Sequence, residues 1–449
     1  MTRMKYINYI EKAMCIVFLL LCAALIFKLY KVTDTVPKLS EQAETAGPAD
    51  AEEKLPALYD LREYGKAPTV KNQGRLGTCW AVAASSALES IILPEKQEIF
   101  SADHMSLQNG FGIQQKDGGD YTMIMAYLAG WRGPVWESDD PYGDGISRVG
   151  LMPRCHVQEM QLLKDKDYEA IKRTVYQYGA VQSTIYMDME NAFSSSVYYD
   201  QLHSSYCYNG DKAPNHDILI IGWNDYYSSD NFTTAPSRNG AFICQNSWGE
   251  DFSDGGVFYV SYDDINIGKD AFAITSIEDT DNYDAMIQTD ICGWVGQLGY
   301  GDDLCYMANR FTSAQDSMIE AVGFYTTGKD TRYEITVMDG DQELSDTLLE
   351  ESDAEGRIAQ PGYYTVKLDE PVRAEAGKDF YVVIKLNTST GGYPAATEYP
   401  ADEATRMAVI TDGDGYISHN GVIWTDTEDE YGCNVCMKIY LSRPGTAGE

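Results

Sequence analysis

The first hydrophobic block of the chain lies near its N-terminus, where residues 13–27 contain no charged side chain. Basic residues stand on both sides of it. The block is shorter than the roughly 20 residues that a membrane-spanning helix prefers, but Leu29 and Tyr30 extend it if the amine of Lys28 reaches the membrane surface. The pattern therefore predicts that residues 1–31 form a membrane anchor or a signal segment, with the membrane as a partner.

Two interpretations of this segment stay open. Cys22, Ala23 and Ala24 form a small-residue site of the kind at which signal peptides are cleaved, and cleavage would give a secreted protein. The hydrophobic block continues past Ala24, which favours an uncleaved anchor. Both interpretations place the rest of the chain outside the cell, because the basic flank stays inside. Residues 32–54 are polar, have no periodic apolar face and predict a flexible linker.

The next stretch, residues 55–284, mixes helical and strand patterns. Residues 79–93 combine good helix formers with an apolar face and contain neither Gly nor Pro, so they predict a buried helix. Further helices are predicted at 120–130 and 166–178. This mixture indicates an α+β domain, in which the strand-like runs are 180–187, 217–223, 240–245 and 256–261.

From residue 285 the pattern changes to short strands separated by turn residues. Pairs such as Asp339-Gly340 and Pro361-Gly362 punctuate them. This spacing is typical of a mainly antiparallel β-sandwich, which would occupy residues 285–449. The predicted strands are 321–326, 333–338, 363–368, 380–386, 407–411 and 437–441.

The composition narrows the choice of partners. The 449 residues include 69 Asp and Glu against 34 Lys and Arg, and the resulting formal charge of −35 would repel nucleic acid. We therefore expect no nucleic-acid partner. Ten cysteines are too few for a disulfide scaffold, and their spacing has no repeated metal-binding pattern, so no metal site is expected. Cys292 and Cys305 could pair with each other, but sequence does not fix connectivity.

Three separated segments of the 55–284 region carry residues that can act together in nucleophilic catalysis. A loop with two glycines delivers Cys79 to the first turn of a predicted helix, where backbone N–H groups and the helix dipole favour a thiolate. His216 opens an apolar, strand-like run and can take a proton from a cysteine. The amide of Asn246 can fix the tautomer of the imidazole, and Trp248 can cover that hydrogen bond. Each residue alone is more often structural, but their occurrence together in this order indicates catalysis.

These segments resemble the active-site motifs of papain-like cysteine proteases. The matching parts are Val70 through Ala81, Asn215-His216 and Asn246 through Gly249, and the resemblance covers about residues 57–282. It implies a two-lobed catalytic domain, with a helical lobe and a β-barrel-like lobe. One departure is Leu76, which stands where many relatives have a disulfide-forming cysteine. Another is the short linker, which leaves no room for a long inhibitory prosegment.

The same resemblance assigns further site residues. Gln73, six positions before Cys79, would donate a hydrogen bond to the developing oxyanion beside the backbone N–H of Cys79. Gly118 and Gly119 resemble the family's glycine pair whose backbone binds an extended substrate, and Trp248 is counted with them as substrate-binding. The family's reaction needs no metal or organic cofactor.

The C-terminal region carries a second resemblance. Residues 321–326 and 421–426 are similar to a lectin-like domain found behind papain-like domains in bacterial surface proteins. The resemblance implies a glycan or protein ligand at the cell surface. Acidic clusters such as Asp426 with Glu428 do not complete a calcium-binding loop, and solvated turn carboxylates account for them better.

The sequence therefore predicts an exported cysteine endopeptidase that hydrolyses peptide bonds through an acyl-enzyme at the cell surface. Protein or peptide substrates would be its partners, and the C-terminal region is expected to be dispensable for cleaving a small peptide. Two alternatives remain. One is a surface adhesin in which the peptidase module is a scaffold, and the other is an envelope transpeptidase that uses the same acyl-enzyme.

Overall fold

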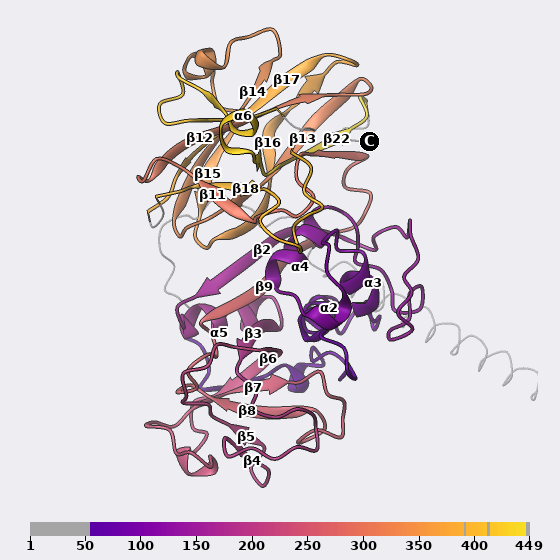
Figure 1. Cartoon of the computed structure of the whole chain (residues 1–449), viewed down its shortest axis with the longest axis vertical. Helices are drawn as coiled ribbons and strands as arrows, with labels where there is room; N and C mark the ends of the chain where they lie inside the picture. Colours follow the sequence, from indigo (N-terminus) through magenta and orange to yellow (C-terminus); the bar gives the residue numbers. More distant parts are fainter. Residues whose placement is uncertain (1–53, 390–391, 411–413, 446–449) are drawn as a thin grey trace, which may run out of the picture. The chain divides into compact units, whose positions relative to one another are not determined.

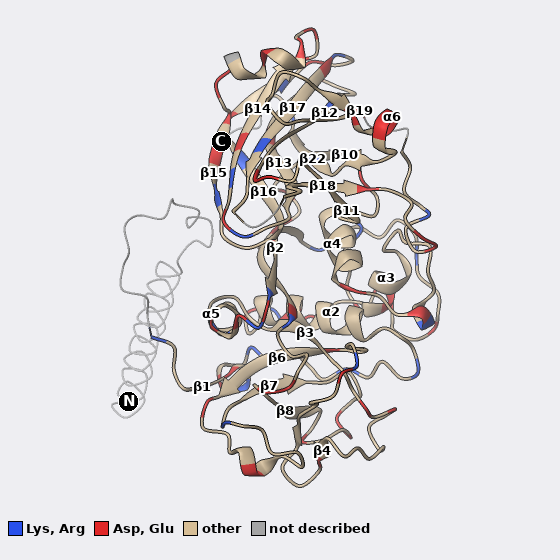
Figure 2. Cartoon of the chain, turned by 60° about the vertical axis from the view of Figure 1, so that its left-hand side comes forward, with Lys and Arg blue, Asp and Glu red and all other residues tan. Residues whose placement is uncertain are grey.

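The computed structural model describes residues 54–389, 392–410 and 414–445 (Figure 1). The predicted anchor or signal segment, residues 1–31, and most of the predicted linker lie outside these ranges. Within the described ranges, no helix has both the length and the apolar character that crossing a membrane requires. Acidic residues are distributed over both the first and the second half of the described chain (Figure 2).

A helical lobe follows the start of the described chain. Its central helix, α2 (Cys79–Ile92), confirms the predicted buried helix, since every residue from Trp80 to Ser90 is buried. Two further helices, α3 (Ala102–Leu107) and α4 (Tyr121–Ala129), pack against it. Asp120 caps α4 by accepting a hydrogen bond from the backbone N–H of Thr122, and this cap explains why the helix begins at Tyr121.

The second lobe is a β-sheet with one helix beside it. The strands predicted in this region are present as β3 (Val181–Ile185), β6 (His216–Asn224), β7 (Ala241–Gln245) and β8 (Val257–Ser261), and the predicted helix is α5 (Tyr168–Gln177). Helix α2 contacts β6, so the helix that begins with a cysteine lies on the strand that begins with a histidine. The sheet also contains β1 (Leu58–Asp60), β2 (His156–Lys164), β4 (Tyr199–Asp200), β5 (Ser205–Tyr206) and β9 (Asp270–Glu278). Its strand order is β2-β9-β3-β6-β7-β8-β5-β4, and β1 pairs with β6.

The C-terminal region is an antiparallel β-sandwich, as predicted. An apolar core that includes Ile319, Phe324, Ile384 and Met437 fills the space between its sheets. One sheet contains β10 (Ala285–Gln288), β22 (Met437–Ser442), β13 (Ser317–Thr326) and β16 (Gly362–Ala374), and the other contains β15 (Ala354–Ile358), β14 (Thr331–Asp339), β17 (Asp379–Asn387), β12 (Leu304–Thr312), β19 (Asp414–Ser418) and β20 (Thr425–Asp426). Short elements complete the region: β11 (Gly296–Leu298), β18 (Ala395–Glu398), β21 (Asn434–Val435) and α6 (Thr427–Tyr431).

The sandwich and the peptidase region share one sheet and one apolar core. Strand β16 pairs with β2, with Tyr363 opposite Met160, so the sheet of the sandwich continues into that of the second lobe. Trp80 of α2 belongs to the same buried cluster as Tyr325 and Tyr363 of the sandwich. This common core argues against the expectation that the C-terminal region is dispensable.

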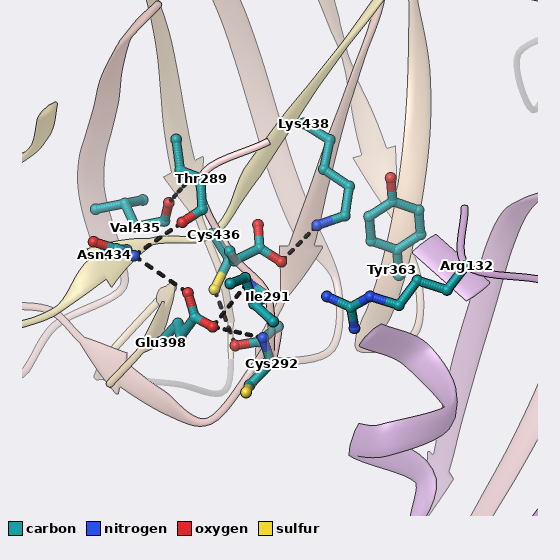
Figure 3. Close-up of polar contacts among 12 residues, drawn as sticks. Arg132, Thr289, Ile291, Cys292, Tyr363, Glu398, Asn434, Val435, Cys436 and Lys438 are labelled. Atoms are coloured by element: carbon teal, nitrogen blue, oxygen red, sulfur yellow. Dashed lines mark hydrogen bonds and ion pairs between the residues drawn. The ribbon is translucent and has the colours of Figure 1, made fainter. Parts of the chain in front are cut away.

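A buried polar cluster lies where the sandwich meets the peptidase region (Figure 3). The ammonium of Lys438 is 2.5 Å from Asp290, and both side chains are only 1% exposed. Glu398 accepts hydrogen bonds from the backbone N–H of Cys292 and of its neighbour. Arg132 comes from the loop after α4, and the charges of Asp290 and Glu398 counteract the lowering of its pKa by burial. The cluster therefore joins charges from both regions.

One expectation about the C-terminal region is wrong, and the pairing of Cys292 with Cys305 that the sequence left open is not present. Residues 407–410 form a turn and a loop instead of a strand. Met407 and Val409 are exposed, so these apolar side chains do not belong to a buried strand. Cys292 and Cys305 are both free, buried thiols, as are the other cysteines of the described ranges apart from the part-exposed free thiol of Cys79. The sequence analysis also missed β2, β9 and β12, in which polar residues such as Gln158 and Asn309 are buried and interrupt the apolar pattern.

Candidate active site

Loop packing fixes the position of Cys79 at the start of α2. The backbone N–H of Gln73 donates to the carbonyl oxygen of Ser247 (2.8 Å), and that of Gly77 donates to the carbonyl oxygen of Gln115 (3.0 Å). A Cβ atom on Gly77 would lie 3.0 Å from two backbone atoms of this neighbouring loop, so glycine permits the close approach. The cysteine is thereby held between the two lobes of the peptidase region.

The thiol of Cys79 faces a carboxylate. Its Sγ lies 3.7 Å from Oδ2 of Asp217, which accepts its hydrogen bond. Burial raises the pKa of the Cys79 thiol to about 12, and the charge of Asp217 adds to the shift. The backbone N–H groups of Asp217 and Trp80 act in the opposite direction but do not offset burial. Burial therefore acts against the thiolate that the position at the helix start was expected to favour.

His216 and Asn246 form the hydrogen bond that the sequence predicts. Nε2 of His216 is 2.7 Å from Oδ1 of Asn246, which also accepts from the backbone N–H of Ser247. Because this amide oxygen can only accept, Nε2 carries the imidazole proton and Nδ1 is left as the basic nitrogen. Burial lowers the pKa of His216 to about 4, against the opposing effect of Asn246. The imidazole is therefore neutral at physiological pH.

Aromatic rings cover this hydrogen bond. The ring of Trp248 is centred 5.1 Å from the ring of His216, and Phe252 packs edge-on against Trp248 at 5.3 Å.

Gln73 is the residue whose side-chain amide was predicted to donate to the oxyanion. The side chain of Gln73 is fixed at both ends, because its Nε2 donates to the carbonyl oxygen of Leu76 and its Oε1 accepts from Ser247. Since an amide carries two N–H groups, one remains for a ligand.

The glycine pair borders the nucleophile's helix. Gly118 has φ of +88°, a conformation that favours glycine. A Cβ atom on Gly119 would lie 2.4 Å from the ring of Trp80, the residue after Cys79. Only a residue without a side chain fits here, so the backbone of this segment lies against the start of α2.

Comparison with known protein families accounts for both halves of the chain. The model of the papain family of cysteine proteases matches residues 55–275, and the model of the lectin like domain matches residues 286–441. Residues 55–275 belong to the papain family.

Curated relatives agree with this papain-like assignment. The chain is 26% identical to falcipain-3 of Plasmodium falciparum over 243 residues, 50% of this chain and 46% of the relative. It is 27% identical to cathepsin S of Bos taurus over 217 residues, 46% of this chain and 60% of the relative. The chain thus spans less than two thirds of the length of these relatives.

Solved structures extend the likeness to both domains. The clostridial cysteine protease Cwp84 after propeptide cleavage matches with a TM-score of 0.74 and 24% identity, over 86% of this chain and 99% of that one. The cysteine protease and lectin-like domains of Cwp84, a surface layer associated protein of Clostridium difficile, match with a TM-score of 0.73 and 24% identity, over 87% and 89%. The fold is therefore that of a papain-like domain followed by a lectin-like sandwich.

Asp217 is a further residue of this papain-like site that the three sequence motifs do not predict. It belongs to the apolar run that follows His216, and a carboxylate next to four apolar residues is itself a signal of a buried charged group. Its Oδ1 accepts a hydrogen bond from Nε2 of Gln182 at 2.7 Å, and its Oδ2 accepts from Cys79. Burial raises the pKa of Asp217 to about 6, and the charge of Asp120 adds to this.

Proposed function

We propose that the chain is an exported cysteine endopeptidase that hydrolyses peptide bonds at the cell surface. The observation that carries the proposal is the arrangement of three residues: α2 presents Cys79 at its first turn, and the strand it packs on begins with His216, which is hydrogen-bonded to Asn246. Nucleophilic acyl transfer by a cysteine requires a basic imidazole nitrogen within reach of the thiol, and the packing of α2 on β6 supports that arrangement.

The reaction begins with a proton transfer that accompanies attack. Burial disfavours a charge on Cys79 or His216 alone, so the two charges form together when the thiol proton moves from Sγ to Nδ1. The sulfur then forms a bond to the carbonyl carbon of the substrate. His216 returns the proton to the leaving amine, the C–N bond breaks, and an acyl-enzyme remains. A water molecule, deprotonated by His216, hydrolyses the acyl-enzyme and restores the thiol.

Hydrogen-bond donors beside the sulfur would stabilise the oxyanion. The backbone N–H of Cys79 lies in the first turn of α2, where N–H groups have no partner within the helix. Gln73 retains one amide N–H after its bond to Leu76. Such donors act where negative charge develops and account for about 10²–10³ in kcat each.

Substrate binding is assigned to the borders of the site. The backbone of Gly118 and Gly119 would pair with an extended peptide, because no side chain obstructs it. Trp248 would exclude water from the site. The reaction requires no metal or organic cofactor.

The organisation of the chain follows from this role. Residues 55–284 would be the catalytic domain and residues 285–449 the domain that binds a cell-surface glycan or protein. Residues 1–31 would anchor the chain in the membrane with residues 32–54 as linker. The similar fold of Cwp84, a surface layer associated protein, supports a location at the cell surface.

The test is cleavage of a denatured protein by the full chain and by its Cys79→Ala variant. We expect turnover by the natural chain, inhibition by a thiol alkylator and no turnover by the variant. A folded natural chain whose turnover is unchanged by Cys79→Ala would overturn the proposal. Release of the acyl group to an added amine instead of to water would identify a transpeptidase.

A further inference from the structure

A second ionisable group, the carboxyl group of Asp217, contacts the nucleophile. Asp217 lies on β6 directly after His216, and its side chain is buried. It holds two hydrogen bonds, one from the thiol of Cys79 at 3.7 Å and one from the amide of Gln182 at 2.7 Å. The mechanism above uses none of its atoms, although a carboxylate buried without a cation is costly to keep charged.

No cation compensates Asp217 among the groups that face it in the described structure. Helix α2 contributes the Cys79 thiol, β3 contributes the neutral amide of Gln182, and the cap of α4 contributes the carboxylate of Asp120. Lys71 lines the same small cavity, but its ammonium is bound 2.6 Å from Glu89. On β6 itself the neighbouring imidazole of His216 is bonded to an amide. The charge of Asp217 therefore acts mainly on the sulfur.

We propose that Asp217 is a positioning residue that keeps the Cys79 thiol protonated and makes the reactivity of the sulfur depend on the charge of its own carboxyl group. The proposal rests on the proposed function, since it concerns the nucleophile of that site.

The two charge states of Asp217 have opposite effects on the sulfur. As a carboxylate, Asp217 accepts the S–H hydrogen bond, and loss of the thiol proton to His216 places two negative charges 3.7 Å apart. After taking up a proton from water, the neutral carboxyl group no longer repels a thiolate, and its O–H can donate to the sulfur. Protonation of Asp217 therefore favours the thiolate–imidazolium pair. The pKa of Asp217, about 6, places this change in mildly acidic solution.

The test measures alkylation of Cys79 by iodoacetamide, an uncharged reagent, between about pH 4.5 and 8. It uses the full chain, and the modified Cys79 peptide is quantified by mass spectrometry. At each pH the rate for Asp217→Asn, which keeps the shape of the side chain, is divided by the rate for the natural chain. A nearby like charge raises a thiol pKa by about one unit or more, and nucleophilicity falls in part as the pKa falls. We therefore expect a ratio of about threefold to tenfold near pH 7.5 that declines toward one below about pH 5.

Asp120→Asn is the matched control. It removes the other nearby carboxylate while leaving a residue that can cap α4. Its ratio should stay close to one near pH 7.5 and below about pH 5, because Asp120 is not among the main causes that shift the pKa of Cys79. Between these values the ratio should fall slightly below one, because the charge of Asp120 helps to raise the pKa of Asp217. An Asp217→Asn ratio that does not change with pH, or that stays at or below one, would overturn the proposal.

A second variant tests the proposal if Asp217→Asn does not fold. Gln182→Met removes the hydrogen bond that stabilises the carboxylate and keeps the length of the side chain. It should raise the pKa of Asp217, so that the pH dependence of Cys79 alkylation moves to higher pH. An unmoved profile would refute the proposal. Alkylation does not depend on turnover, so a pH-dependent ratio without peptide cleavage would reject only the proposed function, whereas cleavage with a flat ratio would reject only the role of Asp217.

Discussion

Phe324 and Tyr325 are neighbours on β13 whose side chains pack into two different apolar cores. Both side chains are fully buried, but Phe324 points into the core of the sandwich and Tyr325 into the core shared with the peptidase region. A Cβ atom on Gly293 would lie 2.7 Å from the hydroxyl of Tyr325 and 3.3 Å from Cβ of Ala126 in α4, so these two side chains approach the same point. Tyr325→Ala should therefore disturb the helical lobe, although it lies far along the chain from Cys79.

The size of the effect follows from the volume that is removed. Truncation of a buried aromatic ring to Ala costs about 3–5 kcal/mol of unfolding free energy. Residues 55–449 form one compact unit, and unfolding entropy is about 2 cal/mol/K per residue. A loss of this size lowers the Tm by about 5 °C, since the entropy of a unit of this length is large. We expect a similar decrease for Tyr325→Ala and Phe324→Ala in calorimetry of the full chain.

The two variants should differ in the peptidase site. Well below the Tm, Tyr325→Ala should lower kcat/KM for a short peptide, whereas Phe324→Ala should leave it close to that of the natural chain. Tyr325→Phe is a further control. The hydroxyl of Tyr325 is buried without a hydrogen-bond partner, so its removal should leave activity and stability intact. Equal kcat/KM in both alanine variants would refute the inference that the shared core supports the catalytic lobe.

Three further predictions concern the charged and catalytic groups. His216→Ala should lower kcat by about 10²–10⁴ without changing the Tm greatly, because general acid–base catalysis is lost; retained kcat would reject the role of His216. The pKa of His216 is lowered to about 4, so its imidazole is neutral and basic above that pH. We therefore expect kcat/KM to fall as the pH falls through about 4. A decline centred near pH 6.5 would contradict the effect of burial on His216. Lys438→Met should lower the unfolding free energy, measured by denaturant titration, by about 3–5 kcal/mol, because it leaves Asp290 buried and unpaired. Adding Asp290→Asn to the same chain should restore part of this free energy. Additive losses from the two substitutions would contradict the pairing.

The chemistry of the site was easier to predict than its electrostatics. Cys79, His216 and Asn246 are recognisable in the sequence because each belongs to a local motif, and α2 and β6 have clear helix and strand patterns. Asp217 was missed because its importance depends on α2 packing on β6, a contact between residues 138 positions apart. The effect of burial on the pKa of the Cys79 thiol was not predictable for the same reason, because it depends on the residues that pack around the sulfur.

The sandwich shows a comparable division. Alternating residues and turn pairs predicted β13, β14, β16, β17 and β22, whereas strands such as β10, β12, β15 and β19 were not predicted. The loop at residues 407–410 has the same apolar character as a strand but lacks a neighbour to pair with, which sequence cannot show. The pairing of β2 with β16 was also not predictable, because it joins Tyr363 to Met160 across two regions with different patterns.

The pairing of β2 with β16 also has a consequence for the substrate selectivity of the proposed peptidase. Backbone hydrogen bonds across this junction, including the one from the N–H of Leu162 to the carbonyl oxygen of Pro361 at 2.7 Å, leave no hinge between the two strands. If the sandwich binds a ligand as proposed, that ligand would be held at a fixed distance and in a fixed orientation from the Cys79 site. Among the proteins of a crowded cell surface, the accessible cleavage sites would then be selected by their spacing from that ligand as well as by their sequence.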